Sequence, residues 1–275
     1  MNLKSLSQQI KIKESFLCVG LDIDLSKIPT HILNEKDPIF VFSKSIIDAT
    51  HKYAVAYKPN LAFFEAYGIE GWKAFEKTID YINKNYPNHF IIADAKRGDI
   101  GNTSGRYAKA FFENYGVDAI TISPYMGRDS IEPFLSFKDK YAVLLTLTSN
   151  EGSRDFQYIE QKGVPVYEKV LRLSTKFENA HNLMYVVGAT KSENLKSIRN
   201  IVPDSFLLIP GVGAQGGNLK EVVLNGINSN CGLIVNSSRG IIYASQGNDF
   251  VEKAAEKAFE LQKEMSEYLK LFKII

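Results

Sequence analysis

Residues 90–103 read Phe90-Ile91-Ile92-Ala93-Asp94-Ala95-Lys96-Arg97-Gly98-Asp99-Ile100-Gly101-Asn102-Thr103, and this stretch is more informative than the rest of the sequence. Its apolar start is typical of a buried strand. Side chains two apart on a strand share a face, so we expect Asp94 and Lys96 to point the same way. Gly98 then allows a sharp turn that leads to Asp99. A buried lysine is stable only beside carboxylates, which keep it protonated. The stretch therefore predicts that Lys96 is a buried proton donor between two acids.

A structural alternative exists for the same stretch. The end of the strand could be solvated and run directly into a helix, with Asn102 or Thr103 as the N-cap. Asp99 would then be favoured only by the dipole of that helix. The two interpretations are separated by the polar residues elsewhere in the chain.

Composition restricts the function classes. The chain has 275 residues, is 45% hydrophobic and carries a formal net charge of +2, which favours neither nucleic acid nor an acidic membrane surface as a partner. No apolar run approaches the roughly 18 residues of a membrane span, and no signal peptide is evident, so we expect a cytoplasmic protein. Cys18 and Cys231 are expected to be buried, reduced thiols. The four histidines show no metal-ligand spacing, so no metal is expected.

Strand-like and helix-like segments alternate along the whole chain. Eight strands are predicted at Phe16–Leu21, Tyr53–Lys58, His89–Ala95, Ala119–Ile122, Ala142–Leu147, Leu183–Val187, Phe206–Ile209 and Leu233–Val235. Amphipathic stretches are predicted near 39–51, 70–85, 103–115, 128–136, 165–180, 191–200, 217–225 and 248–271. This pattern predicts a (β/α)₈ TIM barrel that forms one domain over residues 1–275, with a helix near 3–13 capping its bottom. A doubly wound open sheet is the alternative fold.

A barrel places its chemistry at the carboxyl ends of the strands and in the loops that follow. The unusual polar residues of this chain fall there: Asp22, Asp24, Lys58, Asp94, Lys96, Asp99, Ser149, Asn150, the loop 210–218 and Arg239. Polar residues from distant parts of the sequence are thus expected to converge on one rim. This convergence predicts an enzyme.

The loop Pro210-Gly211-Val212-Gly213-Ala214-Gln215-Gly216-Gly217-Asn218 contains a formal GxGxxG match. A dinucleotide site is poorly supported, because the motif follows the seventh strand and no acid lies about twenty residues further on. In a barrel, the loops after strands seven and eight commonly bind phosphate. Glycines let backbone N–H groups approach an anion, and Arg239 supplies a guanidinium for its oxygens. We therefore expect a phosphate site, the alternative being two tight turns with Arg239 at the surface.

Taken together, these motifs resemble the orotidine 5′-phosphate decarboxylase family, in particular its longer bacterial subfamily, type 2. The resemblance covers almost the whole chain. It is carried by residues 19–22, 57–60 and 63–65, the signature 94–103, and residues 147–150, 210–217 and 238–240. Ile23 stands where a proline is common in that subfamily, which affects only the expected shape of the first loop.

The resemblance implies decarboxylation of orotidine 5′-monophosphate to uridine 5′-monophosphate in de novo pyrimidine biosynthesis, without a cofactor. It implies a catalytic array of Lys58, Asp94, Lys96 and Asp99, with Lys96 as the proton donor to C6. Asp22 would bind a ribose hydroxyl and Ser149 the pyrimidine edge. Gln215 and Arg239 would hold the phosphate, with Pro210 and Ser238 beside them in the substrate site. Asp99, Ile100 and Thr103 would enter the neighbouring subunit's site in a homodimer with shared active sites.

Two other functions remain open at this point. The first is a metal-dependent sugar-phosphate lyase or aldolase, which can share the Asp-x-Lys-x-x-Asp pattern. Enzymes of that kind resemble each other in having a glutamate as a metal ligand at the end of strand two. This chain has Lys58 there, which would repel a divalent ion. A non-catalytic barrel that senses nucleotides is the third possibility. It is disfavoured because the charged array is complete.

Overall fold

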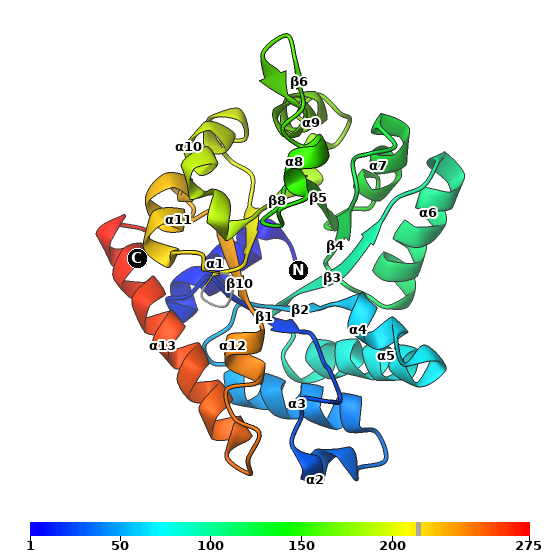
Figure 1. Cartoon of the computed structure of the whole chain (residues 1–275), viewed down its shortest axis with the longest axis vertical. Coiled ribbons are helices and arrows are strands. Elements are labelled where there is room, and N and C mark those ends of the chain that lie inside the picture. The colour runs from blue at the N-terminus through cyan, green and yellow to red at the C-terminus, as the bar shows by residue number, and fades with distance from the viewer. Residues whose placement is uncertain (213–215) are drawn as a thin grey trace. The chain divides into compact units, whose positions relative to one another are not determined.

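The structure is a computed structural model, which describes residues 1–212 and 216–275. Eight parallel strands form a closed barrel in the order β1-β10-β9-β8-β5-β4-β3-β2, and helices lie between consecutive strands (Figure 1). The prediction of a (β/α)₈ barrel is confirmed. The barrel strands are β1 (Leu17–Leu21), β2 (Ala56–Pro59), β3 (Phe90–Arg97), β4 (Ala119–Ile122), β5 (Tyr141–Leu147), β8 (Leu183–Val187), β9 (Leu207–Pro210) and β10 (Leu233–Ser237).

The longer helices follow the predicted amphipathic stretches. They are α1 (Leu3–Lys13), α3 (Pro38–Thr50), α5 (Gly68–Asn85), α6 (Gly101–Lys109), α7 (Arg128–Leu135), α9 (Val166–Ser174), α10 (Ser192–Ile201), α11 (Leu219–Gly226) and α13 (Phe250–Leu271). A π-helical turn at Ala110–Asn114 extends α6. None of the described helices is long and apolar enough to cross a membrane.

By its internal contacts the chain divides into two compact units, which are described separately below. Unit 1 comprises residues 1–95, 115–117 and 236–275, and unit 2 comprises residues 96–114 and 118–235.

In unit 1, β1 and β2 pair in parallel, with Cys18 opposite Ala56 and Gly20 opposite Lys58. Residues opposite one another in a parallel pair point to the same face, so this register fixes which side chains share the interior with Lys58. Outside the strands, α13 packs on α3 and α3 packs on α5. The N-terminus of α3 is defined by the Asp37 side chain, which accepts a hydrogen bond from the Phe40 N–H.

The amino ends of β2 and β3 are covered by α1. Its last residue, Lys13, donates from Nζ to the carbonyl oxygens of His51 (2.5 Å) and Ala54 (2.8 Å), and Nζ lies 2.6 Å from His89 Nε2. These partners stand just before β2 and β3 in the chain. The prediction of an N-terminal capping helix is confirmed.

In unit 2, β4, β5, β8 and β9 continue the parallel pairing. One buried side chain, Arg199 on α10, joins the segments below these strands. Its guanidinium donates to the carbonyl oxygens of Gly226 (2.8 Å), Ser205 (2.6 Å) and Gly232 (2.9 Å). The sequence pattern gave no sign of this residue, because an arginine on a helix is usually solvated.

Several short elements depart from the predicted pattern. The second strand begins at Ala56 rather than Tyr53, because the N–H groups of Tyr53 and Ala54 both bond the Thr50 carbonyl and keep this segment in a turn. Unpredicted short elements are α2 (Thr30–Leu33), α4 (Leu61–Glu65), α8 (Ser153–Phe156), α12 (Arg239–Ile242) and the hairpin of β6 (Glu160–Gln161) with β7 (Val164–Pro165).

Candidate active site

The centre of the polar cluster in unit 1 is an ion pair between two strand ends. Lys58 Nζ on β2 lies 2.7 Å from Asp94 Oδ2 on β3, and the two side chains are only 5% and 11% exposed. The register of β2 with β3 places both residues on one face, since Ala56 is opposite Phe90 and Asn60 bridges to Asp94. A buried pair of this geometry is fixed before any ligand arrives.

The charge of Lys58 is maintained against a large cost of burial. Burial is the largest single influence and lowers its pKa, but the negative charges of Asp94 and Asp22 and the hydrogen bond to Asp94 together raise the pKa above its ordinary value. The neighbouring thiol responds in the opposite way. Burial raises the pKa of Cys18 to about 12, so it stays a neutral thiol. The interior near these strand ends therefore contains a permanent ammonium and no thiolate.

Asp22 directly follows β1 and is half-buried. Its Oδ1 atom is buried and has no hydrogen-bond partner among the described residues. Its backbone is held instead by Tyr243, whose hydroxyl donates to the Asp22 carbonyl at 2.6 Å and accepts from the Asp24 N–H at 2.7 Å. Tyr243 was not predicted as a site residue. It fixes the loop and leaves a carboxylate oxygen available for a donor on a ligand.

Ser238 and Arg239 follow β10 in unit 1. The Ser238 hydroxyl donates to the Gly20 carbonyl at 3.0 Å, which ties the end of β10 to β1. Arg239 begins the short helix α12 and is exposed. The guanidinium is thus accessible to an anion, as the phosphate prediction requires.

In unit 2, Lys96 differs from the prediction. It is exposed, not buried, and its φ of +49° lies in the left-handed region that residues other than glycine rarely adopt. The regular alternation of side chains along the strand ends at this left-handed residue. Asp94 and Lys96 therefore do not share a buried face as expected. Its backbone N–H donates to Thr121 Oγ1 at 2.9 Å, and Thr121 on β4 is 1% exposed. The buried lysine of the array is Lys58 instead.

Asp99 and its neighbours form a tight turn before α6. The Ile100 N–H donates to Asp99 Oδ1 at 2.7 Å, and the Asp99 N–H donates to the buried hydroxyl of Ser104 at 3.1 Å. Ile100 is the N-cap residue of α6 and makes no side-chain cap, so Asn102 and Thr103 are not the caps of the structural alternative. Ile100 is 61% exposed, and Thr103 is also exposed. These two side chains face away from the core of their unit.

Ser149 follows β5 and is held against Gly188. A Cβ at Gly188 would lie 2.1 Å from Ser149 Oγ, so only glycine permits this approach. The hydroxyl of Ser149 is buried and has no hydrogen-bond partner among residues 1–212 and 216–275. A buried hydroxyl without a partner is suited to a polar ligand edge.

Pro210 ends β9 and is half-buried. In the loop after Pro210, the Gly217 N–H donates to the Gly211 carbonyl at 3.1 Å. This hydrogen bond joins the two described ends of the loop. Gly217 cannot be replaced by a larger residue, because a Cβ there would lie 2.4 Å from Ala189 Cβ. Gln215 lies outside the described residues.

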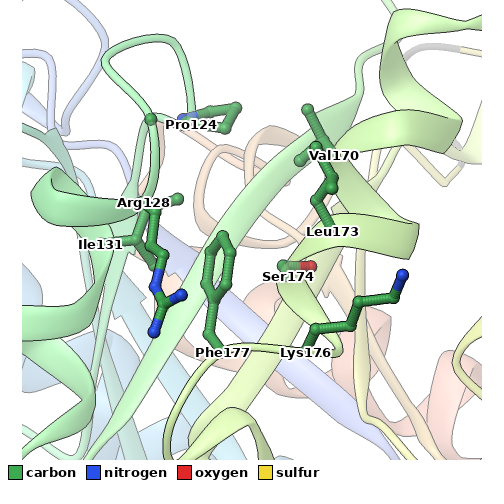
Figure 2. A pocket seen from close by; sticks show the side chains of 9 residues that line it. Pro124, Arg128, Ile131, Val170, Leu173, Ser174, Lys176 and Phe177 are labelled. Atoms are coloured by element: carbon green, nitrogen blue, oxygen red, sulfur yellow. The ribbon is translucent and has the colours of Figure 1, made fainter.

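A separate cavity of about 370 Å³ lies in unit 2, beside α7 and α9. Figure 2 shows the Phe177 ring in its middle, with Arg128 and Lys176 on either side. The residues that line it include none of the predicted site residues. No group of three or more His, Cys, Asp or Glu side chains that could hold a metal ion occurs in the described part of the chain.

Each unit has its own polar groups. Unit 1 has a buried lysine–carboxylate pair, an available Asp22 oxygen and the exposed Arg239, and groups of this kind can stabilise developing charge and bind an anion. Unit 2 has the exposed Lys96, Asp99 and the buried Ser149 hydroxyl, and groups of this kind can donate a proton and bind a polar ligand edge.

Comparison with known proteins gives a consistent result. The family model described as "Orotidine 5'-phosphate decarboxylase / HUMPS family" matches residues 15–256. The orotidine 5′-phosphate decarboxylase of Flavobacterium johnsoniae is 61% identical over 269 residues, which cover 98% of each chain. The Bacteroides fragilis protein of the same name is 58% identical over 271 residues, which cover 98% of this chain and 99% of that one. The solved structure of Leishmania donovani OMP decarboxylase is 34% identical with a TM-score of 0.80, covering 96% of this chain and all of the other (100%).

Proposed function

The chain belongs to the orotidine 5′-phosphate decarboxylase / HUMPS family, and from this we propose that it converts orotidine 5′-monophosphate to uridine 5′-monophosphate with Lys96 as proton donor. The reaction is a step of pyrimidine biosynthesis, and the protein is a carboxy-lyase. The observation that carries the catalytic assignment is the buried ion pair of Lys58 with Asp94, two residues before Lys96 on the same strand.

The chemical difficulty lies at C6 of the orotate ring. When the bond from C6 to the carboxylate breaks, carbon dioxide leaves and the electron pair stays on C6 in the plane of the ring, where the π system cannot delocalise it. A nearby ammonium stabilises this charge directly. Lys96 then transfers one N–H proton to C6, which gives uridine 5′-monophosphate, and the resulting amine regains a proton from water. Lys58 and Asp94 supply a fixed electrostatic environment for this step.

Substrate binding uses the polar atoms that lack protein partners. Asp22 Oδ1 accepts a hydrogen bond from a ribose hydroxyl, and Ser149 Oγ bonds the pyrimidine edge. Both atoms are buried without a partner among the described residues, which supports these roles. Arg239, Gln215 and the segment from Pro210 bind the phosphate, with Ser238 beside them. Phosphate binding far from C6 contributes binding energy that positions the ring.

The active form is a homodimer with shared sites. Asp99, Ile100 and Thr103 of one subunit complete the site of the other. Ile100 is 61% exposed and Thr103 is also exposed, so both side chains are available for contact with a second subunit, which is consistent with this arrangement. Residues 1–275 act as one decarboxylase domain. The free, buried cysteines Cys18 and Cys231 support a cytoplasmic location, where thiols stay reduced.

The first test is turnover of orotidine 5′-monophosphate, followed by ultraviolet absorbance with and without a strong metal chelator. Loss of the orotate absorbance that the chelator does not change is the expected result. Turnover that the chelator stops would contradict a cofactor-free reaction. No turnover by the folded protein would overturn the proposal and leave the metal-dependent sugar-phosphate enzyme and the nucleotide sensor to be separated by ligand binding. Binding of uridine 5′-monophosphate without any turnover would favour a nucleotide sensor.

The role of Lys96 is tested by Lys96→Ala, which should remove nearly all turnover while uridine 5′-monophosphate still binds. Retention of a tenth of the activity would contradict it. The shared site is tested by mixing Lys96→Ala with Asp99→Ala. Each variant alone is inactive, and hybrid dimers contain one intact site, so activity should return after subunit exchange. No recovery would argue against shared sites.

A further inference from the structure

Asn236 is a buried polar side chain for which the proposed reaction gives no role. It lies on β10 and is 7% exposed, and its Oδ1 atom is buried with no hydrogen-bond partner among the described residues. An unpartnered buried polar atom costs on the order of 1–3 kcal/mol. The chain retains this cost at a position close to the ends of the catalytic strands, so a role in the site is the first explanation to test.

Gly20 provides the space into which the Asn236 oxygen points. A Cβ built on Gly20 would lie 3.1 Å from Asn236 Oδ1 and 2.8 Å from Ser238 Cβ. Gly20 is opposite Lys58 in the parallel pair of β1 with β2, so that Cβ would point to the same face as the Lys58 side chain. The Asn236 amide and Lys58 therefore lie on one face, on either side of the missing side chain of Gly20.

Lys58 has donors to offer on this face. An ammonium carries three N–H groups, and Asp94 Oδ2 accepts one of them at 2.7 Å. Asn236 Oδ1 makes no direct bond to Lys58, since it has no partner in the described structure. A single water molecule between the two groups would satisfy both, because it would donate to the amide oxygen and accept from the ammonium. Buried waters typically occupy such polar gaps, and a bridging water is nearly as favourable as a direct bond.

On the basis of the proposed function, we propose that Asn236 is a positioning residue that orients the Lys58 ammonium through one bridging water. It touches neither the substrate nor the reacting atoms. Its effect is to restrict Lys58 to the orientation that faces Asp94, so that the electrostatic environment of the reaction is fixed in advance.

The kinetic test compares three variants with wild type. Asn236→Leu keeps the approximate size and removes the acceptor, whereas Asn236→Asp keeps an acceptor oxygen. We expect Asn236→Leu to lower kcat roughly tenfold, the effect of one lost hydrogen bond to a charged group. KM and the affinity for uridine 5′-monophosphate should be unchanged, and Asn236→Asp should restore most of kcat. Gly20→Ala should lower kcat and also raise KM, because its Cβ would lie 3.1 Å from Asn236 Oδ1 and 2.8 Å from Cβ of Ser238 in the substrate site.

The matched control is Asn182→Leu. Asn182 is also buried, at 8% exposure, but its side-chain amide bonds the Leu135 carbonyl. This variant should lower the melting temperature and leave kcat unchanged. If Asn236→Leu behaves like this control, or if kcat and product affinity fall together, Asn236 has a structural role only.

A crystal structure of the wild-type protein tests the inference without any variant. Density for one water within hydrogen-bond distance of Lys58 Nζ and Asn236 Oδ1 is the expected result, and a direct protein donor on Asn236 Oδ1 would overturn it. The two proposals fail in different ways. Wild-type protein that does not turn over orotidine 5′-monophosphate overturns the proposed function and the inference with it. Wild-type turnover that Asn236→Leu does not change overturns the inference alone.

Discussion

Lys58 and Lys13 are two lysines at opposite ends of the strands of unit 1, and their ammonium groups have opposite properties. Lys58 stands at the carboxyl end of β2 with Asp94 at 2.7 Å, and the nearby carboxylates raise its pKa in spite of burial. Lys13 lies at the amino end, where its partners are two carbonyl oxygens and the His89 ring. Burial there lowers the pKa of Lys13 to about 8.

The difference shows how the hydrogen-bond partners of a buried lysine set its charge. Carbonyl oxygens satisfy the hydrogen bonds of an ammonium but do not balance its charge, so burial favours the neutral amine. Carboxylates balance the charge and keep the ammonium ionised at all physiological pH values. At the amino end the lysine hydrogen-bonds the backbone and is easily neutralised, and at the carboxyl end it stays charged.

The largest expected effect comes from removing the balancing charge at the carboxyl end. Asp94→Asn removes the carboxylate that is paired with the buried Lys58 and leaves only the charge of Asp22 to balance it, which should destabilise the protein by about 3 kcal/mol. Turnover should fall by roughly 10²-fold or more, because a preorganised charge is lost. Denaturant unfolding and steady-state kinetics measure the two effects.

The control for Asp94→Asn is Asp37→Asn in the same unit. Asp37 Oδ2 also lies 2.7 Å from a lysine, Lys77, but the two side chains are 24% and 54% exposed. Solvent screens this pair, so its loss should cost no more than about 1 kcal/mol and leave turnover unchanged. If Asp94→Asn and Asp37→Asn lose the same stability, burial does not determine how much an ion pair contributes in this protein.

A smaller effect is expected at the amino end. Lys13→Met keeps the apolar stem of the side chain and removes the ammonium, which leaves the carbonyl oxygens of His51 and Ala54 without this donor. Stability should fall by about 1–3 kcal/mol. Turnover at neutral pH should not change, in contrast to Lys58→Met, which should be both less stable and inactive. A large loss of kcat in Lys13→Met would show that the two ends are not independent.

The smallest expected effect is a pH dependence of stability that comes from Lys13 and not from Lys58. The folded pKa of Lys13 is lowered from 10.5 to about 8, so between these values the unfolded chain binds a proton that the folded chain does not. Stability from this group therefore rises with pH through that window, by up to about 1.4 kcal/mol per pH unit. Lys13→Met lacks the contribution. The stability difference between wild type and variant should thus widen from pH 8 to pH 10, measured by urea unfolding.

His89 adds a dependence of the same sign in acid. Burial, and then the charge of Lys13, lower the pKa of His89 from 6.5 to about 4. The unfolded chain binds the proton first as the pH falls, so wild-type stability should decrease between pH 6.5 and pH 4. In Lys13→Met the repulsion from the ammonium is absent, and this decrease should be weaker. An identical acid profile for both proteins would show that Lys13 and His89 do not interact.

Much of this fold was predictable from the sequence, because β-branched and apolar runs such as 119–122 and 183–187 specify buried parallel strands with little dependence on context. The barrel then located Asp22, Lys58 and Asp94 at strand ends without further information. The short helices and the β6–β7 hairpin were missed, because elements of two to five residues have no measurable periodicity.

The site was less predictable where it depends on contacts between strands. The expected burial of Lys96 was wrong. It assumed that side chains alternate between the two faces along the whole strand, and this alternation ends at a residue with positive φ. Thr121, whose hydroxyl accepts from the Lys96 N–H, comes from the next strand and carries no sequence signal. Asn236 becomes conspicuous only once its oxygen is seen to lack a partner.

The left-handed backbone at Lys96 also bears on how this chain can be improved by selection. A residue with a Cβ pays a conformational penalty of roughly 1–2 kcal/mol in that region, which glycine avoids, although glycine loses part of the gain through its greater freedom in the unfolded chain. The backbone conformation by itself therefore gives no reason to prefer lysine to glycine at position 96. Glycine is the residue that a consideration of backbone strain alone would choose there, and it would remove the proposed proton donor, so variants of this protein have to be screened for turnover as well as for stability.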